Sequence, residues 1–104
     1  MSDEDYLNLL SDVKDYLKIS WNDDKTDKNL TGMIKRGVKY LQNIAGVDSI
    51  NFTEEDLPKQ LLLDYCRYAN SHALEVFAYN YQGDLLELHF MFQAPLQGAV
   101  TDEN

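Results

Sequence analysis

The sequence contains a single cysteine, two prolines and no long hydrophobic run. Cys66 has no second cysteine to pair with inside the chain, which fits a reducing cytoplasm. No basic stretch precedes an apolar run at the N-terminus, so we expect no secretory signal. The apolar runs extend over a few residues only, so we expect no membrane span.

Positive charge is also scarce, because 9 Lys and Arg residues face 18 Asp and Glu residues and leave a net charge of −9. Such a balance argues against binding a nucleic-acid phosphate backbone, whose affinity comes mostly from Lys and Arg. It argues equally against an anionic membrane surface. We interpret the acidic surplus first as a source of solubility. The alternative is an acidic face for a basic protein partner.

The side chains that usually perform catalysis or bind metals are few. Cys66, His72 and His89 are the only thiol and imidazole groups, and Cys66 and His72 are spaced so that one helix face would not hold both. We expect these residues in the core or at an interface. No serine elbow, phosphate-binding glycine loop or dinucleotide fingerprint occurs. The sequence therefore predicts no enzyme, no cofactor and no metal.

The 104 residues suit one domain, and the hydrophobic fraction of 44% allows a modest core. Apolar residues recur at the helical period, which predicts an all-α fold. We expect a small bundle of about four helices, over 2–19, 28–45, 55–79 and the region 84–93. The third would be the long, central helix. Residues 1–94 would form the domain, and residues 95–104 a mobile C-terminal tail.

The segment 84–93 is ambiguous between helix and strand. Leu86, Leu88, Phe90 and Phe92 would share one face of a strand, whereas a helix would group a different set. We favour the helix, which could continue the third through a kink at Gly83, because a lone strand would have no partner.

Several local signals predict how the helices begin, end and pack. Ser2 and Asp5 resemble a capping box, and Thr26 or Asp27 is expected to cap the second helix. Gly46 follows the last apolar turn, where a left-handed cap is cheapest. Gly37 lies within the apolar stripe of the second helix, and its expected use is to let a neighbouring helix approach closely.

Aromatic residues are plentiful, with seven Tyr, four Phe and one Trp. Such side chains are enriched at protein interfaces, although many must also fill the core. The interface candidates at the end of the chain are Leu86, Leu88, Phe90 and Phe92.

A polar loop between the first two helices contains one large aromatic, Trp21, followed by Asp23, Asp24 and Asp27. A calcium loop would need acidic residues at alternate positions and a central glycine, and this segment has neither. We treat these four residues as interface candidates.

The order of these signals resembles the head–tail connector (adaptor) family of long-tailed phages and related prophages. The likeness covers roughly residues 5–90. It rests on Tyr16-Leu17-Lys18-Ile19, Asp23-Asp24, Asp27, Leu30, Ile34, Tyr40-Leu41, Gly46, Leu57-Pro58, Phe77-x-x-Asn80-Tyr81 and Leu85-Leu86-x-Leu88.

The resemblance implies a structural subunit without catalytic activity. It implies a homo-oligomeric ring of about twelve copies in the virion, at the head–tail interface, after assembly in the host cytoplasm. The ring would dock on the portal protein, contact a downstream connector or tail protein, and let DNA pass without specific binding. Residues 85–104 would contact the portal, and Trp21 with the acidic loop a neighbour or the lower ring. A different interpretation is an acidic helical protein-binding module, such as a regulator or DNA mimic.

Overall fold

The computed structural model describes residues 1–93, all of which lie in helices or their connections. The elements are α1 (Asp3–Tyr16), α2 (Asp24–Ala45), α3 (Leu57–Asn70), a short 3-10 helix η1 (Leu74–Val76), α4 (Phe77–Asn80) and α5 (Gln82–Met91). The predicted all-α class is confirmed, with no strand among the described residues. The predicted tail over 95–104 lies outside them.

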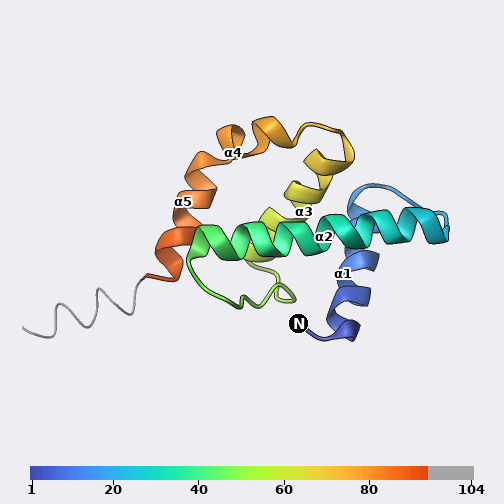
Figure 1. Cartoon of the computed structure of the whole chain (residues 1–104), viewed down its shortest axis with the longest axis horizontal. Helices are drawn as coiled ribbons and strands as arrows, with labels where there is room; N and C mark the ends of the chain where they lie inside the picture. Colours follow the sequence, from blue (N-terminus) through green and yellow to red (C-terminus); the bar gives the residue numbers. More distant parts are fainter. Residues whose placement is uncertain (94–104) are drawn as a thin grey trace, which may run out of the picture.

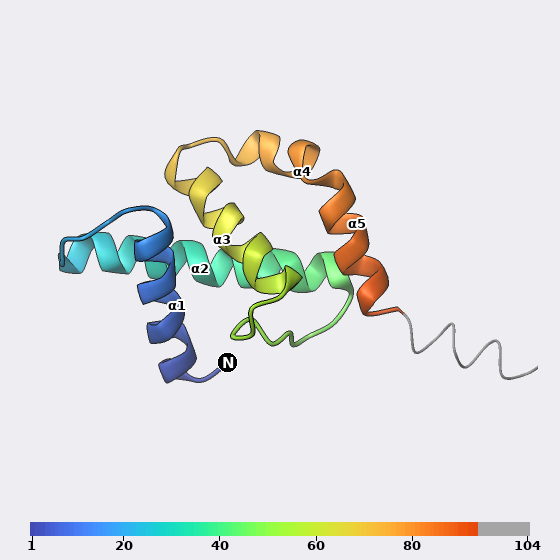
Figure 2. The same ribbon diagram turned by 180° about the vertical axis from the view of Figure 1, so that it is seen from behind.

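The longest helix is α2, which has 22 residues and contacts α1, α3 and α5. In Figure 1 it runs in front of α1 and α3, and from behind in Figure 2 these two helices lie over it. The helix α5 packs against the C-terminal end of α2. The prediction of a long central third helix is therefore wrong, and α2 has the central place.

The third helix ends at Asn70, although its apolar spacing continues further along the chain. His72 adopts a left-handed conformation with φ 58°. The His72 N–H donates to the Ala69 carbonyl and the Ala73 N–H to the Tyr68 carbonyl, at 3.1 and 2.9 Å. This is the Schellman arrangement, which closes a helix. The fourth helix is consequently not a continuation of the third.

Hydrogen bonds also cap the ends of α1 and α2. The predicted capping box is confirmed, since the Asp5 N–H donates to Ser2 Oγ and the Ser2 N–H to Asp5 Oδ2. Gly46 ends α2 with φ 76°, as predicted. The cap of α2 is neither Thr26 nor Asp27 but Asp23, whose carboxylate accepts the Thr26 N–H at 3.0 Å.

Gly37 provides the predicted close approach between α2 and α3. A Cβ at this position would lie 2.7 Å from Leu62 Cδ1 and 2.8 Å from Tyr65 Cδ1. The two helices therefore pack with the α2 backbone against α3 side chains. The connection over 46–56 adds Ile50 and Phe52 to the core between the helices, both fully or almost fully buried.

Polar contacts join α1 to the other helices. Lys59 on α3 binds Asp12 at 3.0 Å and Glu55 at 2.6 Å, and it is almost buried. The Tyr16 hydroxyl donates to Asp64, a buried carboxylate on α3. The Lys59–Asp12 and Tyr16–Asp64 contacts cross the interface between α1 and α3 and so help to fix the angle of α1.

Candidate functional site

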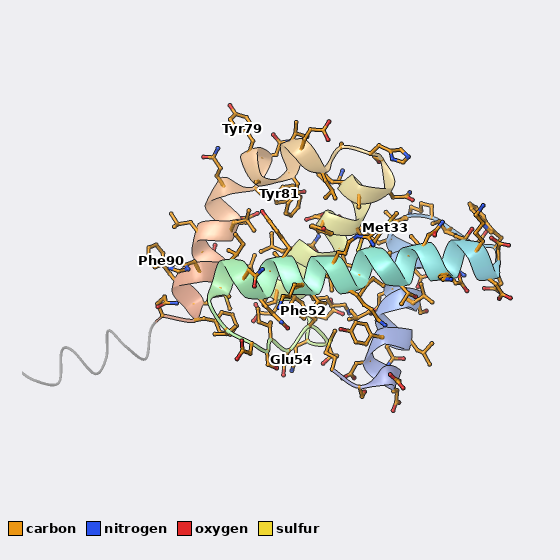
Figure 3. The ribbon with its side chains drawn as sticks, in the orientation of Figure 1. Met33, Phe52, Glu54, Tyr79, Tyr81 and Phe90 are labelled. Carbon is orange, nitrogen blue, oxygen red and sulfur yellow. The ribbon has the colours of Figure 1, made fainter. Side chains whose placement is uncertain are left out.

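The outer face of α5 exposes apolar side chains near the end of the described chain. Leu86 and Phe90 are 55% and 52% exposed, and Met91 next to Phe90 is also exposed, as is Tyr79 on α4. Figure 3 shows Phe90 and Tyr79 pointing away from the helices that they belong to. Two of the predicted interface residues, Leu86 and Phe90, are thus exposed to solvent.

The other two predicted residues of this segment face inward. Leu88 is completely buried in the core, so its prediction as an interface residue is wrong. Phe92 is half-buried and packs against the core. The reason is the helical period, which places Leu85, Leu88 and Phe92 on one face and Leu86 and Phe90 on the other. The helical interpretation of this segment is confirmed.

A shallow groove runs beside this face, between α2 and the α4–α5 region. Its lining is mostly apolar and consists of Tyr40, Ile44, Ala78, Gln82, Leu85, Leu86 and His89. Leu86 belongs both to the groove and to the outer face of α5, so the two surfaces are continuous.

Two hydrogen bonds fasten the end of α5 to the end of α2. His89 Nδ1 lies 2.9 Å from the Ile44 carbonyl oxygen, and Gln93 Nε2 donates to the Ala45 carbonyl at 3.4 Å. These are two of the carbonyls that a helix end leaves without an internal partner. An N–H at Nδ1 of His89 satisfies the first of them, so α5 supplies the tertiary cap of α2.

Trp21 lies in the connection between α1 and α2 and is 55% exposed. It borders a second groove, lined by Leu17, Ile19, Trp21, Thr26, Asn29, Leu30, Met33, Asn70 and His72. This groove joins the α1–α2 connection, α2 and the end of α3. The structure therefore leaves Trp21 available to a partner, at a place separate from α5.

The three acidic interface candidates have structural tasks or lie at the helix start. Asp23 caps α2, and the N–H and hydroxyl of Thr26 that it accepts lower the pKa of its carboxyl. Asp27 binds Lys14 Nζ at 2.9 Å, with Asn22 as a further acceptor for the same ammonium. Asp24 lies exposed in the first turn, where negative charge favours the helix dipole. The acidic residues of this loop therefore contribute first to the stability of the fold.

The thiol of Cys66 is poorly suited to nucleophilic chemistry. Its side chain is fully buried, and this burial raises the pKa of the thiol from 9.0 to about 12. The thiolate is the reactive form, so the folded protein holds very little of it near neutral pH. Among residues 1–93, no group of three or more His, Cys, Asp and Glu residues could hold a metal ion.

We expect the folded chain to resist thiol labelling. With the pKa moved from 9.0 to about 12, the thiolate fraction at pH 8 falls about a thousandfold, and burial slows access further. Reaction with a chromogenic disulfide reagent at pH 8, with and without urea, measures this. Release of one thiol per chain in urea and almost none without it is the expected result. Rapid labelling of the native chain would contradict it.

No protein-family model, no curated protein and no solved structure matches this chain significantly. None of the helices in the described part of the chain is both long and apolar enough to cross a membrane. The functional proposal below therefore depends on the residues and their geometry, together with the resemblance described above.

Proposed function

We propose that this chain is a structural subunit of a phage head–tail connector, which docks on the portal protein and extends the DNA channel towards the tail. The observation behind the proposal is α5, which exposes large apolar side chains although its other face is already buried in the core. Leu85 and Leu88 are buried, while Leu86, Phe90 and Met91 are exposed, with Glu87 among them. Exposed apolar side chains that gather beside polar residues mark protein interaction sites.

A partner that covers the outer face of α5 would remove this exposed apolar surface from water. Large side chains such as Phe90 and Tyr79 are the kind that dominate binding energy when they enter a partner's pocket. The position agrees with the resemblance, in which the segment from residue 85 onward contacts the portal. The helical scaffold behind it, with α5 fastened to α2, holds that face in place.

The remaining parts of the proposal follow from the same resemblance. Copies of the chain would assemble side by side as a ring of about twelve around the DNA channel. The second exposed groove, at Trp21, would serve a contact with a neighbouring copy or the next protein towards the tail. In the virion, the chain would lie at the head–tail interface.

The acidic binding module, as a regulator or DNA mimic, has less support. A DNA mimic needs free carboxylates arranged over a continuous surface, whereas several carboxylates here are engaged. Asp12 and Asp27 bind lysines, Asp23 and Asp56 cap helices, and Asp64 accepts from Tyr16.

The proposal predicts that a double substitution on α5 weakens portal binding. Leu86→Asp with Phe90→Asp places two charges on the outer face, where docking would have to bury them without partners. We expect the affinity for the portal protein encoded in the same genome to fall by about tenfold or more. Co-sedimentation of the full chain with assembled portal rings measures the bound fraction.

The matched control is Ser49→Asp with Asn51→Asp, which adds the same charge in the exposed connection between α2 and α3. It should bind the portal like the unmodified chain. The proposal is wrong if the unmodified chain does not bind portal rings at concentrations of about 100 μM, or if both double variants bind equally well.

A further inference from the structure

The positive charges of this acidic chain are concentrated on one helix. Five of its nine Lys and Arg residues belong to α2, and all five are exposed: Lys25, Lys28, Lys35, Arg36 and Lys39. With 100° between successive residues, they fall within an arc of about 100° on the helix, and they extend over about 21 Å of its length. We call this surface the basic face of α2.

Among residues 1–93, the basic face forms no ion pair with an acidic side chain. The ion pairs of the described residues use Lys14, Lys59 and Arg67, and none of the five cations on α2. Two carboxylates occur on α2, both in its first turn: Asp27 binds Lys14, and Asp24 forms no ion pair with a lysine or arginine of the described residues. In a chain with twice as many acids as bases, five cations on one helix face without an ion pair among the described residues leave a strongly positive surface.

A complementary surface exists on α1. Its outer face consists of Glu4, Leu7, Ser11 and Asp15, which follow one another at helical spacing and are all exposed. The only cation of α1, Lys14, points inward to Asp27 and is nearly buried. The outer face of α1 is therefore acidic, with Leu7 as an exposed apolar residue at 66%.

The other acidic surfaces fit the basic face less well. In the connection before α3, Glu55 binds Lys59 and Asp56 caps the helix. The carboxylates Asp84 and Glu87 lie on α5, which the proposed function assigns to the portal. The 14 residues of α1 match the length of the basic face, about 21 Å each.

We infer that the basic face of α2 binds the acidic outer face of α1 from a second copy of this chain. The choice of a second copy rests on the proposed function, in which copies assemble side by side. One copy then offers both charges, each to a different neighbour, and a contact between two different surfaces continues from copy to copy. Carboxylates of one copy would pair with the free cations of the next, and the contact would weaken with salt.

A charge-swap experiment tests the inference on the full chain. One variant carries Lys28→Glu and Lys39→Glu, which lowers the charge of the five side chains of the basic face from +5 to +1. The other carries Glu4→Lys and Asp15→Lys, which changes the charge of the outer face of α1 from −2 to +2. Neither should self-associate like the unmodified chain, because the first loses most of the attraction and the second opposes like charges. An equimolar mixture should form heterodimers, because the unaltered basic face of the second variant meets the unaltered α1 face of the first. Sedimentation velocity over a range of concentrations measures association, and circular dichroism confirms folding.

The control variant is Glu54→Lys with Glu75→Lys, which makes the same change in net charge as the α1 variant but away from both faces, and it should associate like the unmodified chain. For the unmodified chain, the apparent dissociation constant should rise about tenfold or more between 50 and 500 mM NaCl. Three results would overturn the inference. They are an unmodified chain that stays monomeric at 50 mM NaCl, a mixture that stays monomeric, and binding of duplex DNA that Lys28→Glu with Lys39→Glu abolishes.

The outcome is separable from that of the proposed function. If the mixed variants associate but the unmodified chain does not bind the portal, the contact between copies is supported and the connector function is wrong. If portal binding depends on Leu86 and Phe90 but the mixed variants stay monomeric, the connector function is supported and the contact between copies is wrong.

Discussion

Replacing Phe77 with alanine is expected to remove about 3–5 kcal/mol of folding free energy, which is a large part of the total for a domain of this size. Phe77 is 1% exposed. Its ring lies between four tyrosines, at centroid distances of 4.7 to 6.1 Å: Tyr40, Tyr65, Tyr68 and Tyr81. The substitution leaves a cavity and also removes the aromatic pairs, each of which contributes about 0.5–1.5 kcal/mol beyond area burial.

The location of Phe77 gives this loss a structural consequence. The ring sits at the start of α4 and contacts α2 through Tyr40 and α3 through Tyr65. It therefore anchors the α4–α5 region to the two main helices. We expect the Phe77→Ala variant to lose the fixed position of α5 before it loses the α1–α2–α3 packing.

Urea unfolding followed by circular dichroism measures the loss. Tyr79→Ala on the same short helix is the control, because Tyr79 is 74% exposed and its removal should change the free energy of unfolding by less than about 0.5 kcal/mol. A loss below about 2 kcal/mol for Phe77→Ala would mean that the aromatic cluster is not the anchor described here.

The second large effect is expected at Gly37. Alanine is the better helix former by up to about 1 kcal/mol, so propensity alone predicts stabilisation. The added Cβ would lie 2.7 Å from Leu62 and 2.8 Å from Tyr65, closer than real contacts allow. Overpacking of this kind costs about 1–3 kcal/mol, so we expect net destabilisation for Gly37→Ala and a larger loss for Gly37→Leu.

Gly83 provides the matched control for this test. A Cβ there meets no heavy atom within 4 Å, and the residue lies in the first turn of α5. Gly83→Ala should therefore raise the free energy of unfolding, by up to about 1 kcal/mol. The midpoints of thermal unfolding for the two variants should move in opposite directions. If Gly37→Ala also raises the midpoint, the α2–α3 packing is looser than the structure shows.

Local signals in the sequence were sufficient for much of the fold. The Ser2 capping box, the left-handed Gly46 and the close approach at Gly37 follow from single residues whose chemistry allows few alternatives. The helical nature of 84–93 followed from the lack of any partner strand. The end of α3 could not be predicted in this way, because histidine rather than glycine holds the left-handed position, and the apolar period continues past it.

The candidate site was only partly accessible from sequence. A helix over 82–91 separates Leu86 and Phe90 from Leu88, but only the packing against α2 decides which side faces outward. The net charge of −9 concealed the basic face of α2, because a sum over the chain contains no information on where charges lie. Asp27, which pairs with Lys14, and Asp12, which pairs with Lys59, lie on other helices, so these two ion pairs could not be predicted from the sequence.

The bonds from His89 and Gln93 to the end of α2 have a consequence for recognition. They hold α5 in one orientation before any partner arrives, so its exposed side is already ordered. Binding then pays little conformational entropy for that helix, and more of the contact energy remains as affinity. A partner meets a rigid ridge, which favours docking without rearrangement of the backbone.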